Sequence, residues 1–164
     1  MSGALPTVTL RAARPDEAGL IAGHRRAMFE EMSHLPKAQL EALEAASASW
    51  VAERMTQGVY LGWFAVDGVS VVGGAGLWIM DWPPHRLHLE PRRGYILNVY
   101  VAPAYRRRGL ARALTQQAID WCRANGVRLV TLHASRVGRP VYEGMGFTPT
   151  NEMSLALPAE PPSA

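Results

Sequence analysis

Three consecutive arginines, Arg106, Arg107 and Arg108, precede Gly109 in the stretch NVYVAPAYRRRGLARAL, where a strand-like run passes into a helix-like run. The first backbone N–H groups of a helix have no partners within the helix, and the helix dipole adds positive potential there. Because Gly109 has no Cβ, the backbone can approach a bound group closely. The pattern therefore predicts a phosphate or pyrophosphate site at this junction.

Two other interpretations of the arginine run stay open, a solvated turn and a nucleic-acid-binding module that would use these arginines and Arg112. The formal net charge is only +3, and the other arginines are scattered as pairs and singles. A nucleic-acid surface more often shows a basic stripe and binds with a steep dependence on salt. We therefore expect no nucleic-acid partner.

The remaining reactive side chains predict neither a disulfide nor a metal site. Cys122 is the only cysteine, which excludes an internal disulfide and a multi-cysteine site. His85, His88 and His133 do not have the spacing of a zinc motif. His24 lies in a helical pattern and is interpreted as a packed or surface histidine.

The flanking runs predict a βαβ unit, formed by a strand from about Tyr95, a helix from Gly109 and a strand from Val127 to Ser135 that is buried on both faces. The rest of the chain predicts a mixed α/β sheet with antiparallel hairpins and helices on both faces. The other expected elements are a strand at 7–11, helices from Pro15 and over 39–57, a hairpin turn at 67–68, a loop at 81–93 and a last strand at 150–157.

The length of 164 residues, with 48% hydrophobic and 19% charged residues, predicts one globular domain over 1–157 and a flexible tail at 158–164. The apolar runs are shorter than a membrane helix, so we expect no membrane partner. The first residues show no secretory pattern, which favours a cytoplasmic location.

The segment RRRGLA matches the pattern R/Q-x-x-G-x-G/A, and it follows VYVAPAYR and precedes VRLVTLHAS and GRPVYEGMGF. This order of motifs resembles the GNAT superfamily of N-acetyltransferases, in detail over 94–147 and more coarsely over 7–82. The resemblance implies a GNAT-type single domain of the α/β class, with a mixed, largely antiparallel central sheet and a parallel βαβ unit. It also implies acetyl-CoA as co-substrate, an amine acceptor and no metal, and it leaves a homodimer open.

The resemblance assigns roles to individual residues. Backbone amides from Arg107 to Arg112 would hold the CoA pyrophosphate, and the end of the preceding strand would pair with the pantetheine arm after the two parallel strands separate. Ser135 stands where many members have an asparagine. The cofactor-binding residues implied in this way are Val99, Tyr100, Val101, Arg106, Arg107, Arg108, Gly109, Leu110, Ala111, Arg112 and Ser135.

Tyr142 matches the tyrosine that would protonate the departing CoA thiolate, since a phenol is ordinarily protonated at neutral pH. A backbone N–H of Val99 or Val101 would hold the oxyanion during direct attack by the amine. The predicted acceptor-site residues are Asn98, Trp82 and Glu31.

Some family members place a glutamate where this chain has Tyr95, so the general base is not fixed by the sequence. The open candidates are Glu30, Glu31, His85, His88 and Glu90. An acyl-CoA sensor or an inactive homologue is the alternative function, and the acceptor could be a small molecule, a peptide or a protein.

Overall fold

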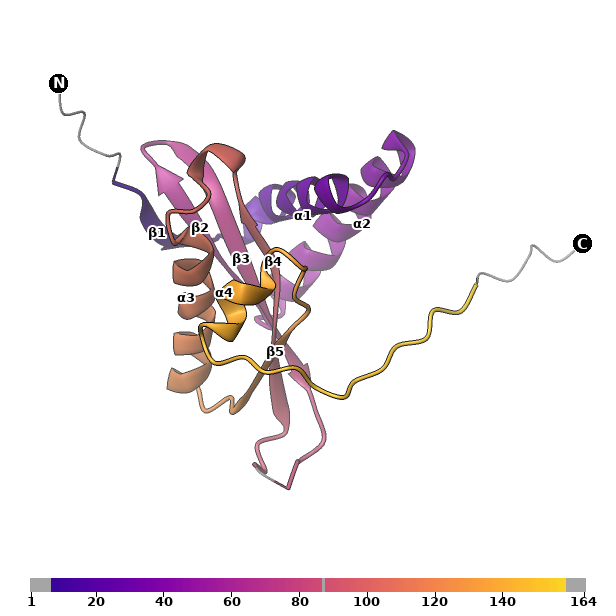
Figure 1. The fold of residues 1–164 in the computed structure, drawn as a ribbon, viewed down its shortest axis with the longest axis vertical. Helices are drawn as coiled ribbons and strands as arrows, with labels where there is room; N and C mark the ends of the chain where they lie inside the picture. Colours follow the sequence, from indigo (N-terminus) through magenta and orange to yellow (C-terminus); the bar gives the residue numbers. More distant parts are fainter. Residues whose placement is uncertain (1–6, 87, 159–164) are drawn as a thin grey trace, which may run out of the picture.

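The computed structural model describes residues 7–86 and 88–158, and it has a five-stranded sheet in the order β1-β2-β3-β4-β5 (Figure 1). The strands from β1 to β4 are antiparallel to their neighbours, whereas β4 and β5 are parallel. The strands are β1 (Thr9–Ala12), β2 (Tyr60–Asp67), β3 (Ser70–Asp81), β4 (Arg92–Val101) and β5 (Leu129–Leu132).

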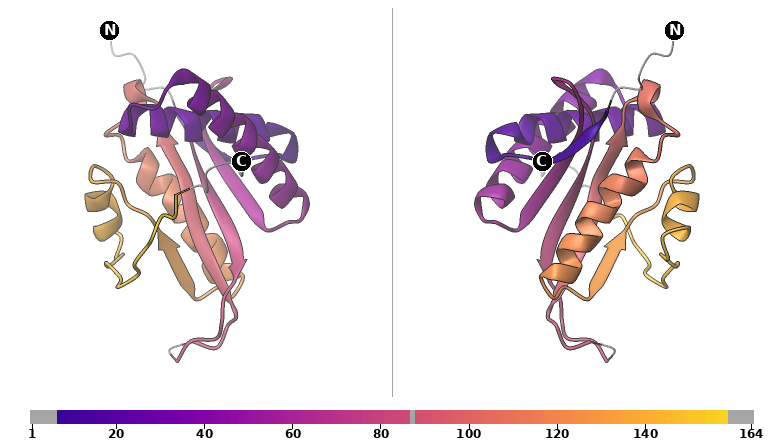
Figure 2. Two further views of the ribbon diagram at one scale, coloured as in Figure 1. Left: turned by 90° about the vertical axis from the view of Figure 1, so that its right-hand side faces the viewer. Right: turned by 90° about the vertical axis from the view of Figure 1, so that its left-hand side faces the viewer.

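The helices cover both faces of this sheet, with α1 and α2 on one face and α3 on the other (Figure 2). The helical elements are η1 (Pro15–Glu17), α1 (Ala18–Met32), α2 (Lys37–Thr56), η2 (Pro103–Tyr105), α3 (Leu110–Ala124) and α4 (Arg139–Glu143). The predicted mixed α/β class and βαβ unit are therefore confirmed. No helix of the described residues is long and apolar enough to cross a membrane.

Helix α3 lies very close to β4 because β4 carries a glycine at the contact. A Cβ built on Gly94 would lie 2.8 Å from Sγ of Cys122, so only glycine allows this approach. The other buried residues of the cluster around the cysteine are Leu77, Ile96, Ala118 and Val127. Cys122 is thus a core residue, as the helical pattern predicts, and burial raises the pKa of its thiol to about 11.

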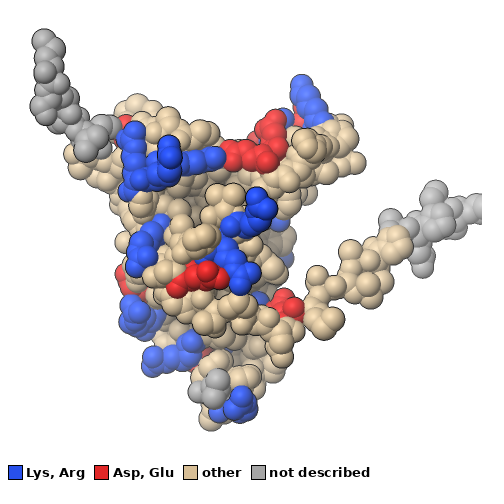
Figure 3. Space-filling view, in the orientation of Figure 1, with Lys and Arg blue, Asp and Glu red and all other residues tan. Residues whose placement is uncertain are grey.

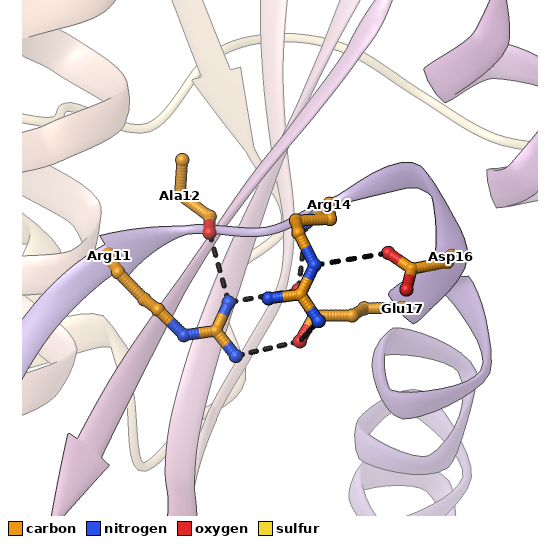
Figure 4. A network of polar contacts seen from close by, with 5 residues as sticks. All are labelled: Arg11, Ala12, Arg14, Asp16 and Glu17. Carbon is orange, nitrogen blue, oxygen red and sulfur yellow. Dashed lines mark hydrogen bonds and ion pairs between the residues drawn. The ribbon is translucent and has the colours of Figure 1, made fainter.

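A charged network fastens the end of β1 to the start of α1 (Figure 4). The Arg11 guanidinium donates to both carboxylate oxygens of Glu17, at 2.7 and 2.9 Å, and the backbone N–H of Arg14 donates to the same carboxylate at 2.8 Å. The Arg11 bonds are the main reason that the pKa of Glu17 is lowered to about 2. This network fixes where α1 begins, and α1 contributes side chains to the site described below.

The structure corrects two expectations for the C-terminal third. Residues 150–157 do not form a strand, and their apolar side chains are exposed, with 94% for Met153, 83% for Leu155 and 79% for Leu157. Figure 1 shows this segment leading away from the sheet, so it has no neighbouring strand to complete its backbone hydrogen bonds. The predicted tail falls outside the described residues, apart from Pro158.

Strand β5 is also shorter and less buried than its sequence predicts. It spans four residues, all half-buried. Val130 and Leu132 pack in the cluster beneath α3, whereas Thr131 between them turns a polar side chain to the opposite face. The apolar run therefore reflects one buried face and not two.

Candidate functional site

Strands β4 and β5 pair over only part of their lengths. The parallel register runs from Arg93 opposite Leu129 to Ile96 opposite Leu132, where β5 ends, while β4 continues to Val101. Beyond Ile96, therefore, β5 does not pair with the backbone of β4. The pairing therefore ends in the region where the resemblance implies that the two strands separate.

A bulge bends β4 within this unpaired stretch. On β3, Gly74 is opposite Tyr100 and Gly76 is opposite Leu97, so β4 carries one extra residue between these pairs. Asn98 lies in the bulge with a φ of 56°, in the left-handed region that asparagine tolerates better than most residues. The bulge changes the direction of the strand where it leaves β5.

The connection from β4 to α3 has the geometry of an anion site. Gly109 is the N-cap of α3 with a φ of 78°, and a Cβ built on it would meet nothing within 4 Å. Arg107 is also left-handed, with a φ of 60°. The N–H groups of Leu110, Ala111 and Arg112 begin the helix and have no intrahelical partners. The junction therefore fits a phosphate group in space and in donor chemistry.

The arginines around this junction do not all face the same way. Arg106 donates from Nε to the carbonyl of Val101 at 2.9 Å and from Nη2 to both oxygens of Glu31, at 2.7 and 2.8 Å. Arg107 and Arg108 are exposed, and the Arg108 guanidinium lies 5.1 Å from the centre of the Tyr105 ring. Figure 3 shows the basic band over this connection meeting an acidic group on α1.

Arg106, predicted to bind the cofactor, and Glu31, predicted to line the acceptor site, thus form an ion pair with each other. Arg112 donates to the carbonyl of Gly144 at 3.3 Å, which links α3 to the segment after α4. Arg106, Arg107, Arg108 and Arg112 are all exposed at the junction, and Arg107 and Arg108 have no carboxylate partner among the described ion pairs.

Tyr142 and Ser135 lie on the segment that follows β5. The Oγ of Ser135 accepts a hydrogen bond from the N–H of Gly138 at 3.0 Å, which stabilises the turn into α4. The Tyr142 ring packs edge-on against Phe147, with centroids 6.0 Å apart, and burial raises the pKa of its hydroxyl. Its hydroxyl forms no hydrogen bond with any described residue, so a protonated phenol is available as a donor.

Asn98 is buried, with only 3% exposed, and does not face solvent as a simple acceptor-site residue would. Its Oδ1 accepts from Nη1 of Arg25 at 3.0 Å, and its Nδ2 donates to the Tyr60 hydroxyl at 2.9 Å. Burial raises the pKa of Tyr60, so that hydroxyl stays protonated. The sequence analysis did not identify Arg25 or Tyr60, because no local pattern relates them to a residue on β4.

Trp82 lies at the opposite end of β4 from the bulge, in the loop after β3. Its ring packs against the Arg93 guanidinium, 4.4 Å from the ring centre, beside a shallow pocket. The three predicted acceptor-site residues therefore do not form one cluster. The pocket residues are Asp81, Trp82, Pro83, Glu90, Pro91 and Arg92.

The described residues contain no group of three or more His, Cys, Asp or Glu side chains that could hold a metal ion. Among them, His24 is half-buried, and its ring packs against Tyr100 and Phe64, with ring centroids 4.9 and 5.8 Å apart. Of the two interpretations left open for His24, these ring contacts support the packed one.

Comparisons with known proteins agree with this geometry. The chain is similar to a GCN5-related N-acetyltransferase from Ralstonia eutropha JMP134, with 37% identity, a TM-score of 0.86, and 92% of this chain and 99% of that chain covered. A predicted acetyltransferase from Clostridium acetobutylicum, solved with acetyl-CoA, has 22% identity, a TM-score of 0.84 and coverage of 92% and 96%.

Glucosamine-6-phosphate N-acetyltransferase from Arabidopsis thaliana shares the fold at 15% identity, with a TM-score of 0.64 and coverage of 92% and 98%. No curated protein matches the chain. Residues 25–147, three quarters of the sequence, match the family model for the acetyltransferase (GNAT) family. The chain belongs to the GNAT acetyltransferase family.

Proposed function

We propose that the protein is an acetyl-CoA-dependent N-acetyltransferase that transfers an acetyl group to a primary amine of a small molecule, a peptide or a protein. The observation that carries this proposal is the end of β4 that β5 leaves unpaired, followed along the chain by the glycine-capped start of α3. A diphosphate at the helix start and an extended arm along the open edge of β4 would together account for both features.

Cofactor binding would use backbone groups more than side chains. The amides of Leu110, Ala111 and Arg112 donate to the pyrophosphate, and the exposed charges of Arg107 and Arg108 add attraction. The open edge of β4 from Val99 to Val101 provides donors and acceptors for the amides of the arm. Ser135 keeps its hydroxyl proton as a donor, because its oxygen serves only as an acceptor in the turn.

The chemistry follows from two groups near the separated strands. A β4 backbone N–H, from Val99 or Val101, stabilises negative charge on the carbonyl oxygen when the amine attacks. Tyr142 donates its hydroxyl proton to the sulfur as the C–S bond breaks. Burial keeps this phenol protonated at neutral pH. Cys122 takes no part, since it is buried on the face of α3 that packs against the sheet.

A second candidate, an acyl-CoA sensor without turnover, is favoured by one observation. Between Tyr95 and Val101, β4 carries no carboxylate that could deprotonate an amine. The sensor would bind acetyl-CoA through the same backbone groups and would release no CoA in the presence of amines.

Calorimetric titration with acetyl-CoA, with desulfo-CoA and ATP as comparisons, tests the shared part of both candidates. Micromolar binding that selects CoA compounds over ATP supports the pyrophosphate site at the start of α3. No binding, or binding of every polyanion that fades with salt, refutes it and favours the nucleic-acid module. An amine screen with detection of free thiol then separates the enzyme from the sensor.

A further inference from the structure

A polar cluster lies on the face of β4 and β5 that is opposite α3. On β4, Gly94 and Ile96 pack beneath α3, so the residues on either side of them turn to the other face. The Tyr95 hydroxyl is hydrogen-bonded to Nδ1 of His133, and the two rings have centroids 5.5 Å apart. Arg93 donates from Nε to Oγ1 of Thr131 at 2.6 Å on the same face.

The Tyr95–His133 pair lies where the two parallel strands separate. Ile96 opposite Leu132 is the last pair of the ladder, Tyr95 precedes it on β4, and His133 follows it on β5. Under the proposed function, the pyrophosphate is held at α3 and the arm enters between the strands. The thioester would then meet the acceptor on the face that carries this pair.

We propose that His133 is the general base that removes a proton from the acceptor ammonium, and that Tyr95 holds the imidazole in position. This inference rests on the proposed function. The donor in the Tyr95–His133 bond depends on the tautomer of the ring. The proposal requires the tautomer in which Nδ1–H donates to the Tyr95 oxygen, because it leaves the lone pair on Nε2 for the incoming proton. His133 is exposed, so it can pass that proton to solvent.

Each proton in the reaction has a donor and an acceptor. Nε2 takes one proton from R–NH₃⁺, and the resulting amine forms the C–N bond. The C–S bond breaks, and the sulfur takes the Tyr142 proton. The nitrogen loses a second proton, which restores Tyr142 through solvent. The products are an amide, CoA thiol and one proton released from His133.

The charged and titratable groups around the pair fit this assignment. Burial is the main cause that raises the pKa of Tyr95. Arg93 on β4 and Arg25 on α1 lower it, and Glu152 on the C-terminal segment raises it. Tyr95 is therefore a neutral phenol that positions the ring. An alkylammonium ion, with a pKa of about 10, needs a separate base at neutral pH, and the free lone pair of an exposed imidazole nitrogen can accept its proton.

The other candidate bases are less well placed. Glu31 is held by two hydrogen bonds from Arg106, and Glu90 is hydrogen-bonded to Arg92 at the start of β4. His85 and His88 form a bridge with each other in the loop between β3 and β4. This loop lies beyond the last pair of these two strands, Asp81 opposite Arg92. Each of these side chains is engaged in another contact or lies away from the strand separation.

Two matched probe amines test the inference. At neutral pH, 4-methoxybenzylamine is an ammonium ion, whereas 4-methoxyaniline is a neutral amine. For His133→Gln, we expect kcat/KM for the benzylamine to fall about 100-fold and that for the aniline to fall less than about fivefold, since only the first must be deprotonated before attack. His34→Gln, at an exposed histidine on the α1–α2 connection, should match the wild type. The benzylamine pH–rate profile should lose its acidic limb in His133→Gln.

A second measurement does not depend on turnover. Ring ¹⁵N spectra at about pH 8 should show His133 as the Nδ1–H tautomer in the CoA complex, and Tyr95→Phe should shift it toward the other tautomer. Spectra that are the same in both proteins would overturn the positioning role of Tyr95.

Equal losses with the two amines, or no loss with either, would overturn the assignment of His133. A wild-type protein that binds acetyl-CoA but acetylates neither amine would also overturn it, because a base at this position should serve any small amine that reaches it. Failure to bind acetyl-CoA is a different result, since it refutes the proposed function itself.

Discussion

Acidification from about pH 8 to about pH 5 should destabilise the fold through one histidine of α1. His24 packs against Tyr100 and Phe64, and a Cβ built on Gly74 would lie only 2.9 Å from its Nδ1. Burial lowers the pKa of His24 from 6.5 to about 4, because the closely packed surroundings disfavour the charged imidazolium.

The sign and size follow from proton linkage. Between these two pKa values the unfolded chain binds a proton at His24 and the folded chain does not, so acid favours unfolding. The stability contributed by the neutral ring is complete above pH 6.5 and is lost as pH falls toward 4. Each pH unit in this window costs about 1.4 kcal/mol, which gives about 2 kcal/mol at pH 5.

Urea unfolding gives the free energy of unfolding of the wild type and of His24→Leu at both pH values. The pH-dependent change in the wild type minus that in the variant is the contribution of His24. The wild type should lose about 2 kcal/mol more than the variant on acidification. Other titrating groups contribute equally to both proteins, and the low pKa of Glu17, about 2, places its own loss below pH 4.5. Equal pH dependence in the two proteins would refute the buried, neutral state of His24.

Three further substitutions test the site. Gly109→Glu should weaken acetyl-CoA binding more than about 100-fold by calorimetry, whereas Gly68→Glu, which carries the same left-handed strain in the β2–β3 turn, should bind normally; equal effects would make the loss one of backbone strain. Tyr142→Phe should keep the Kd for acetyl-CoA and lower kcat about 10- to 100-fold, and an unchanged kcat would remove the hydroxyl from the mechanism. Asn98→Leu should cost about 2–4 kcal/mol in urea unfolding, because it leaves the buried Tyr60 hydroxyl unpaired and puts leucine at a positive φ; a cost under about 1 kcal/mol would contradict this.

The sequence predicts well what local chemistry determines. A glycine after three arginines, at the start of an amphipathic helix, identifies the α3 cap, and Asp67-Gly68 identifies the hairpin, since each depends on a few adjacent residues. The apolar alternation of Met153, Leu155 and Leu157 is equally local, but a strand also needs a neighbouring edge. The alternation of apolar residues carries no information on whether the sheet has a free edge beside them. The predicted last strand was wrong for this reason.

Contacts that depend on register could not be predicted. Tyr95 and His133 are 38 residues apart, and they meet only because β4 and β5 pair in one parallel register. Arg25 and Asn98 are 73 residues apart and meet across α1 and the β4 bulge. A one-residue shift in either strand would turn these side chains to the opposite face.

The position of Arg106 changes how the arginine run is understood. Its pair with Glu31 lies at the surface, with 42% and 44% of the two side chains exposed, so it contributes at most about 1 kcal/mol to stability. Its geometric effect is larger, because the same guanidinium also holds the carbonyl of Val101, and Arg25 holds Asn98 three residues earlier on β4. Helix α1 is thus fastened to β4 at two points along the stretch that leaves β5. The first arginine of the run therefore sets the spacing between α1 and the open strand edge, while Arg107, Arg108 and the dipole of α3 provide the positive potential for a phosphate.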